Sequence, residues 1–231
     1  MTRALALLLS LAVAGCSGLT ESQAGVVGIE VQVPGPDSLE VGESIQLGAK
    51  PLDKNGDSAA VAVTWVSVDP TASIDPATGV LSGLSVGTAR IQAVVGSLGS
   101  SLINFAIVPR ADTLSISGDS IFTASVSTTP LPDFTTVLWS FSPLGPVPTH
   151  GVIYAITSPD PLTTPPAVVL STNSQVADTV PTNTDGAAVT SLALVAGATP
   201  PDSVVVTVSA TRIRGAVVPG SGQRFILRFT P

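Results

Sequence analysis

The chain has 231 residues, of which 44% are hydrophobic and 11% are charged, and its formal net charge is -7. Nine lysines and arginines stand against sixteen acidic residues, which argues against nucleic acid as a partner because phosphate binding needs a basic face. The single cysteine, Cys16, leaves no second thiol for a disulfide, so each folded domain must rely on its apolar core.

The first fifteen residues have the features of a removable export signal. Arg3 is followed by an apolar run over residues 4–14. This run is about half as long as the roughly 20 apolar residues that a helix needs to cross a bilayer. Residues 1–15 are therefore predicted to be a signal peptide rather than a membrane span, with the mature protein beginning at Cys16.

The residues around Cys16 resemble the lipobox of bacterial lipoproteins, in the form Val13-Ala14-Gly15-Cys16. The resemblance implies that Cys16 is a lipidation site that carries acyl chains such as palmitate, and two or more chains attach a protein stably to a membrane. The alternative is a bystander thiol at an ordinary secretory cleavage site. The serine after Cys16, in place of an aspartate, favours the outer membrane in a cell with two membranes.

The residues after the signal have the composition of strands and turns, rich in Val, Thr, Ser, Gly and Pro. Their length suits two small domains. We expect a lipidated cysteine and tether over residues 16–25, a first domain over 26–109 and a second over 111–231. The predicted fold is all-β, with two tandem immunoglobulin-like antiparallel β-sandwiches.

Alternation with a period of two predicts the core strands of the first domain. Ile45 and Leu47 share one face of a strand over residues 44–50, and Ile91 lies on the apolar face of a strand over 88–94. Between them, Trp65 supplies the largest side chain and is the predicted centre of the core.

Four ordered motifs in this domain resemble the bacterial immunoglobulin-like group 2 domain, at residues 39–47, 63–67, 74–83 and 86–93. The resemblance implies a small sandwich without a disulfide, in which Trp65 packs between the sheets. It further implies turn conformations, which glycine tolerates, at three positions. These positions are Gly42, Gly79 and Gly87.

The second domain shows looser spacing and more prolines, but its strands alternate as well. Val137, Trp139 and Phe141 share one face, and Phe225 and Leu227 share another; Trp139, Phe225 and Leu227 are the predicted core residues. Residues 182–192 and 203–210 resemble the closing strands of the invasin- and intimin-type immunoglobulin-like domain.

The segment Gly83-Leu84-Ser85-Val86-Gly87 fits the Gly-x-Ser-x-Gly pattern of serine hydrolases. A nucleophile elbow joins a strand to a helix, whereas this segment runs into a predicted strand, so we interpret Ser85 as a turn residue. The lone His150 lies in a proline-rich loop and is interpreted as a solvated loop residue. We therefore predict no catalytic residue and no enzyme activity.

Two acidic segments imitate calcium loops. Residues 53–57 place oxygen ligands at alternate positions, but the bidentate glutamate of such a loop is missing, and a turn on Asn55-Gly56 is the better account. Residues 183–186 receive the same interpretation. Calcium at the domain junction would draw on Asp112, which alone supplies too few ligands. We expect no metal and no cofactor.

These predictions together favour a surface-displayed, lipid-anchored, non-catalytic binding, adhesion or spacer module of the cell envelope. Its partners are then the membrane, through Cys16, and a protein or glycan ligand at the loops. The proline-rich residues 158–166 form either a stiff connection or a recognition loop. One alternative function is a structural subunit of an envelope assembly. Another is a carbohydrate-binding module, which requires an exposed aromatic platform.

Overall fold

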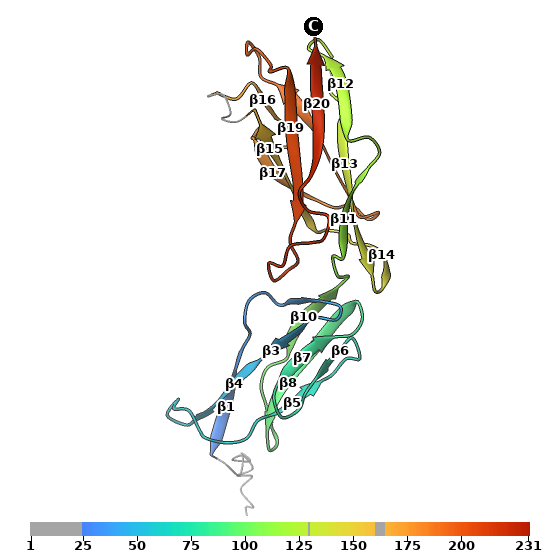
Figure 1. The fold of residues 1–231 in the computed structure, drawn as a ribbon. Coiled ribbons are helices and arrows are strands. Elements are labelled where there is room, and N and C mark those ends of the chain that lie inside the picture. The colour runs from blue at the N-terminus through green and yellow to red at the C-terminus, as the bar shows by residue number, and fades with distance from the viewer. Residues whose placement is uncertain (1–24, 129, 160–164) are drawn as a thin grey trace, which may run out of the picture.

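The computed structural model describes residues 25–128, 130–159 and 165–231. Two β-sandwiches follow one another along the chain and meet end to end (Figure 1). The predicted all-β class with two tandem immunoglobulin-like sandwiches is confirmed, and the described residues contain no helix that can span a bilayer. The predicted signal peptide, Cys16 and residues 160–164 of the proline-rich segment lie outside the described residues.

Short strands build the first sandwich in three sheets. One sheet has the order β2-β10-β8-β5, with β9 paired to β8; another has β3-β7-β6, and β1 pairs with β4. The strands are β1 (Val26–Gln32), β2 (Ser38–Glu40), β3 (Ser44–Gln46), β4 (Gly48–Asp53), β5 (Thr64–Ser67), β6 (Ala72–Ile74), β7 (Val80–Gly83), β8 (Gly87–Val95), β9 (Leu98–Gly99) and β10 (Ile103–Val108).

The strand predicted over residues 44–50 is divided at Leu47. Before this residue, β3 pairs with β7, and after it, β4 pairs with β1. The amide of Leu47 donates to the carbonyl oxygen of Gly79 at 3.0 Å, which places Leu47 under the 75–79 turn. The alternation of Ile45 and Leu47 survives the division, and both side chains are buried.

The core of the first sandwich surrounds Trp65, whose residue is 5% exposed. Ile91 lies in the same cluster of buried side chains and is fully covered. The three glycines named from the resemblance all have positive φ angles, with values of 81°, 75° and 150° for Gly42, Gly79 and Gly87. Gly79 faces the indole ring so closely that a β-carbon there would lie 2.5 Å from Trp65 Nε1.

The second sandwich consists of two larger sheets, with the orders β11-β13-β18-β16 and β12-β20-β19-β15-β17, and β14 pairs with β13. Its strands are β11 (Thr113–Ser117), β12 (Ile121–Ser125), β13 (Asp133–Phe141), β14 (Leu144–Pro146), β15 (Gly151–Ser158), β16 (Val168–Leu170), β17 (Ala177–Pro181), β18 (Ala187–Leu194), β19 (Ser203–Ala210) and β20 (Gln223–Thr230). Most pairs are antiparallel, but each sandwich contains one parallel pair, β2 with β10 and β12 with β20.

Aromatic rings fill the core of the second sandwich. Phe134 and Phe225 stack with their ring centroids 4.8 Å apart, and both are fully buried. The phenol of Tyr154 donates to the carbonyl oxygen of Ala188 at 2.7 Å and accepts from the hydroxyl of Thr136, also at 2.7 Å. Burial raises the pKa of Tyr154 to about 12. These two hydrogen bonds link β15 of one sheet to β13 and β18 of the other, and they satisfy the buried hydroxyl of Tyr154 inside an apolar core.

The predicted core position Trp139 is wrong, because this side chain lies on the outer face of β13 and is only partly buried. The inner face instead carries Phe134, Thr136, Leu138 and Ser140. Alternation shows which side chains share a face, but it does not show which face is inside. The face with Val137, Trp139 and Phe141 is the outer one, although its side chains are large and apolar. The inner face contains two hydroxyl residues, Thr136 and Ser140, and Thr136 forms a hydrogen bond with Tyr154 there.

Candidate functional site

The two sandwiches are joined by a very short connection. The last strand of the first, β10, ends at Val108, and β11 begins at Thr113, so four residues link the domains. Within this link, Ala111 is fully buried in the core of the second sandwich. The chain therefore passes from one core to the other almost without a flexible segment.

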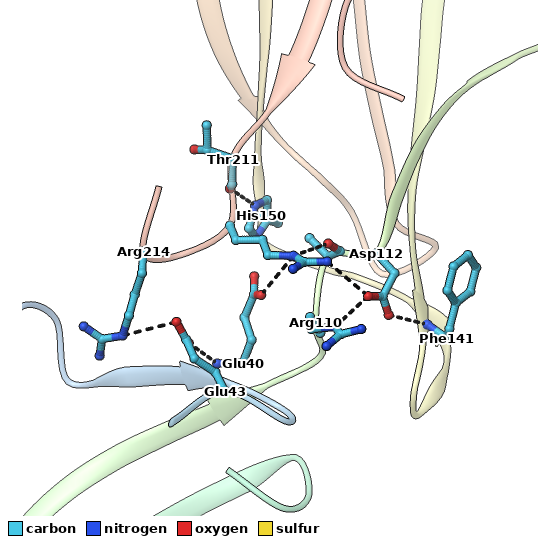
Figure 2. A network of polar contacts seen from close by, with 10 residues as sticks. Glu40, Glu43, Arg110, Asp112, Phe141, His150, Thr211 and Arg214 are labelled. Atoms are coloured by element: carbon cyan, nitrogen blue, oxygen red, sulfur yellow. Dashed lines mark hydrogen bonds and ion pairs between the residues drawn. The ribbon is translucent and has the colours of Figure 1, made fainter. Parts of the chain in front are cut away.

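The loop between β19 and β20 carries two arginines from the second sandwich to the first. A tight turn shapes it, because the amide of Arg212 donates to the carbonyl oxygen of Ala216 at 2.7 Å. The turn closes when the amide of Gly215, at a φ of 87°, donates to the carbonyl oxygen of Arg212 at 2.8 Å. Arg214 leaves this turn toward Glu43 of the first sandwich (Figure 2). Arg212 lies within ion-pair distance of Glu40 of the same sandwich.

Arg212 is the central charge of the junction. Its Nε lies 3.7 Å from Glu40 Oε2 of the first sandwich and donates to the carbonyl oxygen of Ala111 at 3.0 Å. One of its terminal nitrogens lies 3.4 Å from Asp112 Oδ1. A single guanidinium thus bridges two buried carboxylates from different parts of the chain (Figure 2).

Asp112 is held from three sides. Besides Arg212, it accepts from Arg110 Nε at 2.6 Å and from the backbone amide of Phe141 at 2.8 Å. Two arginine guanidinium groups therefore compensate the charge of Asp112, the one carboxylate that the sequence offered for calcium at this junction. No cluster of three or more potential metal ligands occurs among the residues described.

Arg214 also connects the two sandwiches, through contacts with residues 34–43 of the first. Its guanidinium donates to the carbonyl oxygens of Pro34 at 2.7 Å and of Pro36 and Ser38 at 3.3 Å. Its Nε lies 3.3 Å from Glu43 Oε1. The planar fork of arginine suits this array of acceptors, which a lysine ammonium cannot match.

Glu40 is the most deeply buried acid at the junction, at 1% exposure, and its Oε1 has no hydrogen-bond partner within the described part of the chain. Burial raises the pKa of Glu40 above its ordinary value of 4.5, because removal from water disfavours the charged form. The backbone amides of Ala111 and Ile213, and the charges of His150 and Arg212, oppose this rise without cancelling it.

This raised pKa predicts a pH-dependent difference between the wild type and Glu40→Gln. The folded protein binds more protons than the unfolded chain above pH 4.5, so the contribution of Glu40 to stability is greatest below that value. The contribution falls as the pH rises through the raised pKa. In urea titrations, we expect the free energy of unfolding of the wild type minus that of Glu40→Gln to decrease from about pH 4 to about pH 7. A difference that stays constant or increases contradicts this account.

His150 is not the freely solvated residue that the sequence suggested. It is partly buried, and its Nε2 donates to the carbonyl oxygen of Thr211 at 2.7 Å, at the base of the arginine-bearing loop (Figure 2). Its own amide donates to Thr182 Oγ1 at 2.9 Å. His150 therefore helps to position the β19–β20 loop.

The other candidate residues lie in turns. Ser85 is exposed in the connection from β7 to β8, between two strands, and its amide donates to the carbonyl oxygen of Thr71. Asp53 Oδ1 accepts from the amides of Asn55 and Asp57, at 2.8 and 2.9 Å, and these bonds lower the pKa of Asp53. The same pattern recurs at Asn183, whose Oδ1 accepts from the amides at 185 and 187.

No family model and no curated protein sequence matches this chain. Similar solved structures are domains 4 and 5 of the S-layer protein SbsC, with 13% identity, 90% of this chain and 100% of that chain covered, and a TM-score of 0.33. The adhesin InvE of Yersinia pseudotuberculosis shares 15% identity over 85% of this chain and 57% of its own, with a TM-score of 0.37. The fibronectin(III)-like modules of Clostridium thermocellum CbhA share 13% sequence identity over 87% of this chain and 94% of their own chain, with a TM-score of 0.40. These values are too low to assign a ligand or a role.

Sequence reasoning did not find the junction. Arg212 and Arg214 belong to no motif, and Glu40 lies within the 39–47 motif without a predicted role of its own. The usable signal was the pair of arginines between two predicted strands in a chain with few basic residues.

Proposed function

We propose that this chain is a bacterial surface lipoprotein, attached through Cys16, whose two sandwiches form a non-catalytic module that displays a binding surface away from the envelope. The first sandwich resembles the group 2 bacterial immunoglobulin-like domain. The second resembles the invasin- and intimin-type domain. The lipid fixes one end, and the second sandwich is the distal part.

The observation that carries this proposal is the bridge from Glu40 through Arg212 to Asp112. Domains in one chain move relative to each other unless their interface is substantial. Here, buried carboxylates require their arginine partner, since an unpaired buried charge is costly. The distance between the two ends of the module is thereby held constant, which is the property that a spacer needs.

The anchor is tested by expressing the chain with its own first residues in a bacterium that has two membranes. We expect the wild type in the outer-membrane fraction, beginning at Cys16, with an intact mass that exceeds the polypeptide mass by its acyl groups. Cys16→Ser is expected to lose both the acyl mass and the membrane association. Recovery of unmodified wild-type protein in the soluble periplasm would contradict the proposal.

A further inference from the structure

The outer face of β13 presents an apolar surface that the core does not use. Phe141 is 63% exposed and Leu144 is 77% exposed, and Val189 of the neighbouring β18 is 42% exposed. Trp139 and Val137 lie between them and are partly buried. We define the β13 face as Val137, Trp139, Phe141, Leu144, Pro146 and Val189.

The strand registers show that this surface is continuous. Phe141 lies opposite Leu144, and Trp139 lies opposite Pro146 on one side and Thr113 on the other. Directly paired residues point to the same side of a sheet, and residues two apart along a strand lie about 7 Å from each other. The side chains of Trp139 and Phe141 therefore stand in adjacent rows on the same face of the sheet.

Hydroxyl groups line the same rows. They belong to Thr113, Ser115 and Ser117 of β11 and to Thr135 of β13. None of the four hydroxyls makes a hydrogen bond in the described part of the structure. Other sheet-surface hydroxyls pair with one another at 2.7 to 2.8 Å, as Ser44 with Ser82, Thr157 with Thr207 and Ser171 with Ser191 do.

The β13 face is also uncharged. The rows from Phe141 to Thr135 contain no acidic or basic residue on β11, β13, β14 or β18. The first charge along β13 is Asp133, at the far end of the strand. Because the whole chain has a net charge of -7, two copies repel each other, which disfavours a second copy as the occupant. A neutral partner with both apolar and hydrogen-bonding groups fits this surface best.

We propose that the β13 face binds a neutral glycan chain. Sugar rings carry an apolar face of C–H groups, which packs on the aromatic rings of Trp139 and Phe141. Their hydroxyls exchange hydrogen bonds with the free hydroxyls of β11 and Thr135. This inference names the ligand class for the proposed display role, and it does not depend on the lipid anchor.

Trp139 provides a direct readout, because the second indole, Trp65, is buried in the other sandwich. Purified full-length protein is titrated with cellohexaose, xylohexaose, mannohexaose and maltohexaose, followed by tryptophan fluorescence and calorimetry. We expect saturable binding of at least one hexaose with a change in Trp139 emission. Trp139→Ala and Phe141→Ser are each expected to weaken it about tenfold or more, whereas Trp139→Phe retains most of it.

Leu84→Ser is the matched control, since Leu84 is 55% exposed on the first sandwich and lies outside the β13 face. Its affinity is expected to equal that of the wild type, and thermal unfolding checks that each variant folds. The proposal is overturned when no hexaose binds, or when binding survives both Trp139→Ala and Phe141→Ser. It is also overturned when sedimentation shows that the β13 face joins two copies, in a dimer that Trp139→Ala dissolves. Because purified protein is used, these outcomes are independent of lipidation at Cys16.

Discussion

Arg212→Ala is expected to lower the free energy of unfolding by about 3 kcal/mol and to release the two sandwiches from their fixed orientation. Arg212 is the shared partner of Glu40 and Asp112, and both carboxylates are almost fully buried. Asp112 keeps its ion pair with Arg110 in this variant, whereas the buried carboxylate of Glu40 loses its guanidinium partner, and such an uncompensated buried charge costs about 3–5 kcal/mol. The lower end applies here because the Arg212 side chain is 28% exposed and water enters the space that it leaves.

Two measurements check this prediction. Urea unfolding gives the change in stability, and small-angle scattering gives the distribution of distances within the molecule, which is expected to broaden in Arg212→Ala. Arg90→Ala is the matched control, because Arg90 and Asp69 form a surface ion pair in which both residues belong to the first sandwich. We expect a smaller loss of stability and no broadening. A broadening of equal size in both variants would show that the junction does not depend on Arg212.

The strand pattern predicts the sandwich interiors because burial and alternation coincide along most strands. Ile91, Phe225 and Leu227 are fully buried on the faces that alternation assigns to the core. Both faces of β13 are rich in large side chains, and there the pattern fails: an indole lies outside while Thr136 lies inside. The buried hydroxyl of Thr136 is satisfied by Tyr154, which is 18 residues away, so the local pattern does not reveal that a threonine is tolerated inside.

The junction lies beyond sequence reasoning for a different reason. Arg214 donates to carbonyl oxygens that are 176 to 180 residues earlier in the chain. Such contacts leave no local period, and their acceptors are backbone atoms that every residue possesses. They follow from the end-to-end placement of two domains, which the alternation within each domain does not determine.

Gly79→Ala is expected to destabilise the first sandwich by about 3 kcal/mol, through two effects that act at one atom. Gly79 has a φ of 75°, where an L-residue is strained by about 1–2 kcal/mol. The added β-carbon also lies 2.5 Å from Nε1 and 2.9 Å from Cε2 of the Trp65 indole. The ring is buried at the centre of the core, so it moves only by disturbing its neighbours, and overpacking of this kind costs about 1–3 kcal/mol.

Gly56→Ala separates the two effects. Gly56 has a similar φ of 84°, but a β-carbon there meets nothing within 4 Å, so only the backbone strain of about 1 kcal/mol is expected. Urea unfolding in a Trp139→Phe background, where Trp65 is the only indole, measures both variants. If Gly79→Ala costs no more than Gly56→Ala, the indole does not pack against the 75–79 turn. A larger loss of unfolding free energy in Gly79→Ala, together with a shift in the emission of Trp65 in the folded state, supports the packing of the indole against the 75–79 turn. The contact between Gly79 and Trp65 then contributes to the stability of the core.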